Sequence, residues 1–285
     1  MNSRAFCDTV GLVELEHILR FLSEPASYPH RPPRVEVVQT HISAIFLAGH
    51  LVYKVKKPVN LGFLDFTTLE RRRHFCQEEV RLNRRLCPEV YLGVEVIGRT
   101  NGALSLGRGE PVEYAVVMRR LPQDRMMDAL LARGELTPRM VEDVAACLAD
   151  FHERAATDER IAAFGRPEAI RVNTDENFAQ TERYRGRLLS PQQFSDIRRF
   201  TEAFLERREL FEERIRRGRV RDGHGDLHLQ HICLADRIYI FDCIEFNERF
   251  RYGDVAVDLA FLLMDLDFHD RPDLARLLER RYQEL

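Results

Sequence analysis

The stretch from His224 to Asp242 restricts the fold of this chain more than any other. It opens with a polar turn, His224-Gly-Asp226, and further histidines follow as far as His231. Two short apolar runs come next, around Ile232 and from Ile238 to Asp242, and runs of this length favour strands over helices. The patterns before and after this stretch are mostly helical. The sequence therefore predicts a small strand pair beside polar side chains, set within a helical region.

The first 120 residues have the pattern of a β-rich unit with one long helix. The expected strands span residues 35–38, 42–47, 51–55, 90–97 and 113–118. The long helix begins near Leu69, where Thr67 and Glu70 have the spacing of a capping box. Beyond Leu121-Pro122, helical periodicity dominates, at residues 138–154, 175–184 and 191–217 and again from Val257.

This order predicts an α+β protein with two lobes. Residues 1–34 form an N-terminal helical extension, with a helix from Leu12 to Leu22. Residues 35–121 form a small β-rich N-lobe, and residues 122–285 form a larger, mainly helical C-lobe. Two lobes of this kind usually hold a ligand in the cleft between them.

Composition excludes several classes of protein. No apolar run approaches the roughly 20 residues of a membrane span, and no secretory signal is visible. The 6 cysteines show no CxxC pairing, which favours reduced thiols in a cytoplasmic protein. The sequence also lacks the glycine-rich motifs GxxxxGK[ST] and GxGxxG and the hydrolase motif GxSxG.

Charge is distributed unevenly along the chain. The first 120 residues carry a net charge of +4 and the remaining 165 carry −7. The acidic second part argues against nucleic acid as its main partner. The split suits a polyanion bound by the first part and a neutral or cationic substrate bound by the second, although solvated charged faces would give the same numbers.

Lys54 and Glu79 are the first pair of residues that the pattern brings together. The run Leu51-Val-Tyr-Lys54 matches the Val-Ala-Ile-Lys arrangement, in which the lysine reaches nucleotide phosphates. Glu79 lies on the apolar stripe of the long helix, whereas Glu78 shares a face with several arginines. A carboxylate on an apolar stripe needs a charged partner. We predict an ion pair between Glu79 and Lys54; a partner elsewhere, or exposure at the edge of the stripe, is the alternative.

Asp226 and Asp242 fit two roles in a transferase. Asp226 would orient the hydroxyl of the substrate, and Asp242 would coordinate Mg²⁺ through oxygen. A rival hypothesis takes His224, Asp226, His228 and His231 as ligands of Zn²⁺ or Fe²⁺ in a metal-dependent hydrolase. That hypothesis leaves Lys54, Glu79 and Asp242 without a role.

Together these residues resemble the aminoglycoside phosphotransferase-like kinases, over about residues 35–270. The specific part is His224-Gly-Asp-Leu-His228 with the later Gly253-Asp-Val-Ala-Val-Asp258-Leu-Ala. The runs Thr40-His-Ile-Ser43, Tyr53-Lys-Val-Lys-Lys-Pro58 and Phe63-Leu-Asp-Phe66 are similar to an uncharacterised bacterial branch of that family. In that branch, a P-loop ATPase-like kinase domain often follows.

The resemblance implies a protein-kinase-like fold with ATP between the lobes. Met118 would be the gatekeeper, and the backbone of Arg119 to Leu121 would bind adenine. Thr40 to Ser43 would take the place of the loop that covers the phosphates. Asp258, together with His224, would support the catalytic loop from behind. Only 15 residues separate Asp242 from Asp258, which leaves little room for a regulated activation loop.

Two features depart from the family pattern. His231 stands where an asparagine is expected as the second metal ligand, and imidazole is a poor ligand for Mg²⁺. Either Gln230 or water substitutes, or Mn²⁺ is favoured, or catalysis is weakened. The chain also ends at Leu285 with no P-loop domain after it, so we expect a stand-alone or shortened member for which such a domain is a potential partner.

The leading hypothesis is an ATP- and Mg²⁺-dependent phosphotransferase that acts on a hydroxyl group of a small molecule. The alternative is a nucleotide-binding pseudokinase or regulatory module, followed by the metal-dependent hydrolase. Acidic residues after the catalytic loop suit a cationic acceptor, or form a solvated rim. These residues are Glu245, Glu248, Asp265, Asp267 and Asp270. The sequence does not identify the acceptor.

Overall fold

The structure of the protein is a computed structural model, of which residues 14–285 are described. The chain divides into two compact units. Unit 1 comprises residues Met1–Met140 and His228–Asn247, and unit 2 comprises Val141–Leu227 and Glu248–Leu285. This division differs from the predicted one, because the strand pair after His228 groups with the N-terminal sheet. The assignment of ATP binding to residues 35–121 and of catalysis to residues 122–285 stays a prediction.

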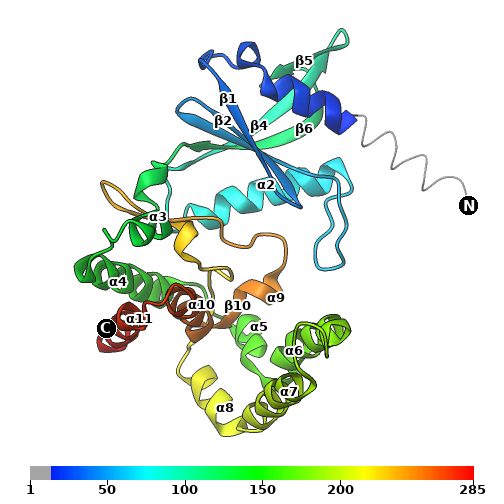
Figure 1. Ribbon diagram of the computed structural model, residues 1–285. Coiled ribbons are helices and arrows are strands. Elements are labelled where there is room, and N and C mark those ends of the chain that lie inside the picture. Colours follow the sequence, from blue (N-terminus) through cyan, green and yellow to red (C-terminus); the bar gives the residue numbers. More distant parts are fainter. Residues whose placement is uncertain (1–13) are drawn as a thin grey trace, which may run out of the picture. The chain divides into compact units, whose positions relative to one another are not determined.

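Unit 1 is built on one antiparallel sheet of six strands in the order β1-β2-β3-β6-β4-β5 (Figure 1). The strands are β1 (Val35–Gln39), β2 (Ser43–Ala48), β3 (Leu51–Lys56), β4 (Tyr91–Thr100), β5 (Ala103–Leu106) and β6 (Glu110–Arg119). Alternate residues of a strand point to opposite faces of the sheet. In β3, Tyr53 and Val55 therefore face one side, whereas Lys54 and Lys56 face the other.

The face with Tyr53 and Val55 is covered by the N-terminal helix, residues 14–23. Ile18, Leu22 and Tyr28 from this part of the chain are at most 1% exposed in that cluster. The predicted helix from Leu12 is present where the structure describes it, and its first two residues lie outside the described range. The segment predicted as an extension thus supplies core side chains to unit 1.

The opposite face is covered by α2 (Leu69–Asn83), which packs against β6 and β4. Thr68 caps this helix by accepting a hydrogen bond from the Arg71 N–H, so the prediction of Thr67 as the cap was wrong by one residue. Thr67 instead donates its hydroxyl to Asp65 in the preceding loop. Glu79 is completely buried on the face of α2 that meets the sheet.

Unit 1 is completed by short elements after β6 and by the returning segment. These are η2 (Gln123–Arg125), α3 (Met127–Ala132), η5 (Leu229–His231), β8 (Ile232–Leu234) and β9 (Ile238–Ile240). β8 and β9 pair as an antiparallel hairpin, which confirms the predicted strand pair. β9 ends at Ile240, so Asp242 lies just beyond the strand.

Unit 2 is mainly helical. Its helices are α4 (Pro138–Arg154, which begins in unit 1), α5 (Glu159–Ala162), η3 (Ala163–Gly165), α6 (Pro167–Thr181), η4 (Glu182–Tyr184), α7 (Pro191–Leu205), α8 (Arg208–Arg216), α9 (Glu248–Arg251), α10 (Val255–Phe268) and α11 (Pro272–Glu284). The single helix predicted over residues 191–217 is broken near Arg207, whose ψ of 56° leaves the helical region. Strands β7 (Val220–Asp222) and β10 (Tyr252–Asp254) pair beside the His224–Asp226 turn.

Two further predictions bear on the class of protein. No helix within residues 14–285 has the length and apolar character needed to cross a membrane. Of the cysteines in the described range, none forms a disulfide, and Cys76, Cys87, Cys233 and Cys243 are buried.

The packing of the N-terminal helix can be tested at Leu22. Leu22→Ala should lower the free energy of unfolding by about 2–5 kcal/mol, because it leaves a cavity where a fully buried side chain met the sheet. Urea denaturation would measure this loss. Glu16→Ala, an exposed change on the same helix, is the control. Equal stability of the two variants would contradict the packing described.

Candidate active site

A cavity of about 610 Å³ opens in unit 1 beside Lys54 and Asp242. Most of its wall is apolar, and Ile45, Leu47, Val52 and Val90 contribute to it. Its lining includes many of the predicted site residues: Thr40, Lys54, Met118, Arg119, Leu121, Gln230, His231 and Asp242. Ser43 and Glu79, which were also predicted, are buried and do not line the cavity.

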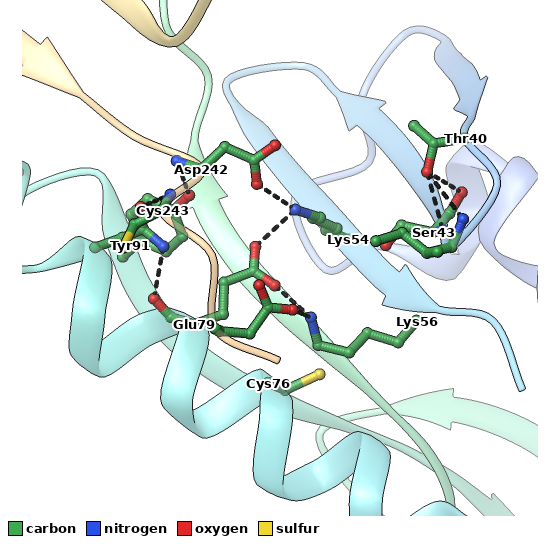
Figure 2. Close-up of polar contacts among 12 residues, drawn as sticks. Thr40, Ser43, Lys54, Lys56, Cys76, Glu79, Tyr91, Asp242 and Cys243 are labelled. Carbon is green, nitrogen blue, oxygen red and sulfur yellow. Dashed lines mark hydrogen bonds and ion pairs between the residues drawn. The ribbon is translucent and has the colours of Figure 1, made fainter. Parts of the chain in front are cut away.

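Lys54 lines this cavity and lies between the carboxylates of Glu79 and Asp242 (Figure 2). Its Nζ lies 2.9 Å from Oε1 of Glu79 and 2.6 Å from Oδ1 of Asp242. The predicted ion pair between Glu79 and Lys54 is therefore confirmed. The structure also brings Asp242 into contact with Lys54, although 188 positions separate the two in the sequence.

Lys56 was not predicted as part of this network. Its Nζ donates to Oε2 of Glu79 at 2.6 Å and also to Oε1 of Glu245. Lys56 is 1% exposed and Glu245 is 8% exposed. The suggestion that Glu245 belongs to a solvated acidic rim was wrong, because Glu245 is buried against Lys56. The periodicity of β3, which puts Lys56 on the same face as Lys54, was the signal available in the sequence.

Burial and charge act against each other in this network. Burial alone would lower the pKa of Lys54 and of Lys56, but the facing carboxylates raise both above the ordinary lysine value. Burial acts to raise the pKa of Glu79, yet Lys54 and Lys56 hold it below its ordinary value. Burial keeps the pKa of Glu245 above its ordinary value although Lys56 opposes this. Both lysines and Glu79 are accordingly charged at neutral pH.

Asp242 has an unusual backbone conformation. Its φ of 63° lies in the left-handed region, which costs free energy in residues other than glycine. Its N–H donates to the hydroxyl of Tyr91 at 3.3 Å. Burial acts to raise the pKa of Asp242, but Lys54 and His231 outweigh it and lower the pKa. The second carboxylate oxygen of Asp242 lies 3.8 Å from Nε2 of His231.

The turn between β1 and β2 is fixed by its own polar groups (Figure 2). The Ser43 N–H donates to Oγ1 of Thr40 at 3.0 Å, and Lys57 Nζ donates to the Thr40 carbonyl at 2.6 Å. The Ser43 hydroxyl is buried and has no hydrogen-bond partner within residues 14–285. This turn lies at the cavity through Thr40.

The segment after β6 presents backbone groups to the same cavity. The N–H groups of Arg119 and Arg120 donate to the carbonyls of Val90 and His50, at 2.8 and 2.9 Å. The N–H of Leu121 has no such acceptor in the described part of the chain. Of the donors predicted to bind adenine, Leu121 is therefore the one left available, since Arg119 uses its N–H within the protein.

In unit 2, Asp258 holds the turn that carries Asp226. Its carboxylate accepts hydrogen bonds from the backbone N–H groups of His224 and Gly225, at 2.7 and 2.8 Å. His152 Nε2 lies 3.2 Å from the same carboxylate, and its Nδ1 lies 2.8 Å from the hydroxyl of Tyr282. Burial acts to raise the pKa of Asp258, but its hydrogen bond to His152 contributes to lowering it.

The glycine before Asp226 is required by the backbone. Gly225 has a φ of 87°, and a Cβ there would lie 2.7 Å from the carbonyl oxygen of Phe250. A larger residue cannot occupy this position without moving the turn. The Asp226 N–H donates to Nδ1 of His224 at 3.3 Å, so His224 acts as an acceptor inside the turn.

The rival hypothesis of a histidine-rich metal site gains no support. Within residues 14–285, no group of three or more His, Cys, Asp or Glu side chains is arranged to hold a metal ion. His224 is 1% exposed and bonded within its turn, and the ring of His231 packs against Phe241 with centroids 5.9 Å apart. A Mg²⁺ site shared with nucleotide phosphates needs only one or two protein carboxylates, which Asp242 can supply.

The contacts of Asp258 predict the effect of replacing it. Asp258→Asn puts an amide N–H₂ against one of the two N–H groups, so one donor loses its acceptor. Stability should fall by about 1–3 kcal/mol in urea denaturation, and the amide of His224 or that of Gly225 should exchange faster with solvent. Asp267→Asn, an exposed change on the same helix, is the control. Wild-type exchange at both His224 and Gly225 in Asp258→Asn would contradict this arrangement.

The chain is similar in sequence to one protein family and to proteins from two mycobacteria. The sequence model of the phosphotransferase enzyme family matches residues 63–285. Uncharacterized proteins from Mycobacterium bovis and Mycobacterium tuberculosis are each 36% identical to the chain over 244 residues. The aligned region is 85% of this chain and 48% of each relative. The chain thus spans about half the length of the curated relatives it matches.

The fold has a counterpart among solved structures. The ADP-bound crystal structure of aminoglycoside phosphotransferase APH(2'')-Ib matches with a TM-score of 0.50 and 16% identity, over 88% of this chain and 78% of that chain. At this identity the likeness concerns the fold, which is α+β and protein-kinase-like, as predicted. The match of 223 residues to one family model, together with the mycobacterial relatives, shows that the chain belongs to the phosphotransferase enzyme family.

Proposed function

We propose that this chain transfers a phosphoryl group from ATP to a hydroxyl group of a small molecule, with a divalent metal ion. The observation that carries the proposal is the cavity of unit 1, in which apolar walls end at Lys54. That lysine is held by Glu79 on one side and by Asp242 on the other. The apolar walls suit the flat base of a nucleotide, Lys54 suits its phosphates, and the carboxylate of Asp242 suits a metal ion.

The adenine would lie against the apolar wall near Met118. The free N–H of Leu121 is suited to donate to a ring nitrogen, and the Arg119 carbonyl is suited to accept from the amino group. The phosphates would extend toward Lys54, under the turn of Thr40 and Ser43. The fold likeness to an ADP-bound aminoglycoside phosphotransferase agrees with a nucleotide at such a cavity.

Asp242 is the residue best suited to hold a metal ion. One of its oxygens contacts Lys54, and its side chain is 40% exposed, so its other oxygen remains accessible. A bound Mg²⁺ would neutralise charge on the phosphates. Gln230 lines the cavity and offers an amide oxygen, whereas His231 offers nitrogen, which suits Mn²⁺ better than Mg²⁺. The affinity for ATP, measured once with Mg²⁺ and once with Mn²⁺, shows which of the two ions the site prefers.

Asp226 would orient the acceptor hydroxyl and accept its proton. The turn that carries Asp226 is fixed by Asp258 and by the left-handed glycine before it. Only Leu227 separates Asp226 from His228, where the chain enters unit 1. We therefore assign the general-base role to Asp226, as the family resemblance suggests.

The acceptor is proposed to be a small molecule. The short span from Asp242 to Asp258 has no room for the long activation loop of a kinase that acts on proteins. A cationic acceptor has less support than the sequence suggested, because Glu245 is buried with Lys56 and Glu248 is paired with Arg160. A cytoplasmic location and a P-loop ATPase partner stay predictions.

Asp226→Asn should reduce phosphoryl transfer by about 100-fold or more, because a general base contributes on that order. Binding of ATP with Mg²⁺ should remain near the wild-type value, since the nucleotide cavity belongs to unit 1. Turnover of ATP would be measured with a panel of aminoglycosides, amino alcohols and sugars as acceptors. Asp150→Asn, an exposed change on α4, is the control. Unchanged turnover in Asp226→Asn would exclude the assigned role.

The neighbouring glutamates of α2 provide a matched pair. Glu79→Gln removes the negative charge that faces Lys54 and should weaken ATP binding by about 10-fold or more, because breaking a buried ion pair leaves the remaining charge uncompensated. Glu78→Gln should leave binding unchanged, because Glu78 pairs with Arg81 at the surface. Calorimetric titration with ATP and Mg²⁺ measures both variants. Equal affinities would show that Lys54 does not depend on Glu79.

His231 favours a second candidate, a pseudokinase that binds nucleotide without transferring phosphate. Its ring is buried beside Asp242 at the position where the family pattern expects a metal ligand. ATP binding without turnover toward any acceptor, with Mg²⁺ or Mn²⁺, would favour this candidate.

A further inference from the structure

Five acidic and basic side chains of unit 1 are linked in series by four ion pairs, and the short main-chain segment between the two end residues closes this series into a ring. Asp242 contacts Lys54, Lys54 contacts Glu79, Glu79 contacts Lys56, and Lys56 contacts Glu245. Charges alternate along this series. Its two ends, Asp242 and Glu245, lie on the same short segment after β9, so the segment itself closes the ring.

Glu79 is the part of the ring that both lysines share. Its Oε1 lies 2.9 Å from Lys54 and its Oε2 lies 2.6 Å from Lys56. With both oxygens engaged, the carboxylate cannot rotate toward one lysine without leaving the other. The position of Lys54 in the cavity therefore depends on Lys56, which does not line the cavity.

Lys56 in turn depends on Glu245. Lys56 is 1% exposed, so water cannot solvate its ammonium group, and a buried charge without sufficient partners is costly. Without Glu245, the carboxylate partner left to Lys56 within residues 14–285 would be Glu79, for which Lys56 would compete with Lys54. Glu245 thus keeps Glu79 available to Lys54.

Backbone contacts show that the segment bearing Asp242 needs to be held. Asp242 has a φ of 63°, a conformation that persists only where its surroundings impose it. The next N–H, that of Cys243, donates to Oδ1 of Asn83 at 2.9 Å. Asn247 Nδ2 donates to the Phe63 carbonyl at 3.0 Å. Between these anchors, Glu245 is the residue of the segment that is tied to the sheet by charge.

We propose that Lys56 and Glu245 are positioning residues that set the place of Asp242, and through Glu79 that of Lys54, for the metal-bound nucleotide. This inference rests on the proposed function. It assigns a role to a second lysine of β3 and to a glutamate that neither lines the cavity nor touches a reacting group. The ring would hold Asp242 in place permanently, so phosphorylation of the protein would not be needed to position it.

The alternative to positioning is a role in stability alone. Replacing a buried ion pair by apolar residues of similar size is often neutral or stabilising. The double variant Lys56→Met/Glu245→Leu can therefore keep the fold while it removes the ring. A stability role predicts that this variant works normally once folded. A positioning role predicts that it stays impaired in its use of metal.

The experiment measures calorimetrically how the affinity for a non-hydrolysable ATP analogue depends on Mg²⁺ concentration. Lys56→Met/Glu245→Leu should need about 10-fold more Mg²⁺, as when groups that orient a metal ligand are lost. Glu245→Asp, which keeps the charge but shortens its reach, should give a smaller shift and keeps the inference testable if the double variant unfolds. Urea denaturation reports the stability of each variant. Arg237→Met/Glu89→Leu, which removes an exposed ion pair of unit 1, should leave the Mg²⁺ dependence unchanged.

The outcomes separate this inference from the proposed function. If the wild type binds the analogue with Mg²⁺ and the ring variants share its Mg²⁺ dependence, the positioning role is overturned and the proposed function stands. If the wild type shows no Mg²⁺-dependent nucleotide binding, both are overturned. A shift in the ring variants, with none in the Arg237/Glu89 control, supports the positioning role.

Discussion

The burial of two lysines on one face of β3 is the constraint on which the site of unit 1 depends. Lys54 and Lys56 lie between a sheet and a helix, where charge must be compensated by the protein. The compensation comes from Glu79 of α2 and from Asp242 and Glu245 of the segment after β9. Three parts of the chain that are far apart in sequence are thereby brought to one place, and the cavity ends at a lysine paired with carboxylates.

The other face of β3 explains why the N-terminal helix belongs to the same unit. Tyr53 and Val55 alternate with the lysines and pack with Ile18 and Leu22 in one apolar cluster. The strand that carries Lys54 is therefore held between an apolar layer and a charged one. The family model begins at residue 63, after β3, so the position of Lys54 is established by strand geometry and contacts, independently of that match.

The sequence predicted the parts of the site that lie on regular elements. Helical periodicity separated Glu79 from Glu78, and the run Leu51-Val-Tyr-Lys54 gave Lys54 as its partner. Alternation along β3 puts Lys56 on the same face as Lys54, but its partner Glu245 lies in an irregular segment, where no period indicates which side chains turn inward. Asp258 was placed by its motif, and only the structure shows that it binds two backbone N–H groups. Long-range contacts of irregular segments therefore escaped prediction.

Two left-handed residues show how the chain fixes its candidate carboxylates. Gly225 can adopt its φ of 87° without a penalty, and the nearby Phe250 carbonyl leaves no space for a Cβ. Asp242 adopts a φ of 63° although it has a side chain, so its contacts must offset the cost. At position 225 the glycine avoids the strain, and the buried carboxylate of Asp258 holds the turn. At position 242, an ion pair with Lys54 and a hydrogen bond to Tyr91 impose the conformation. A residue needed for its carboxylate cannot be replaced by glycine, so at Asp242 the cost of the left-handed backbone has to be offset by side-chain contacts.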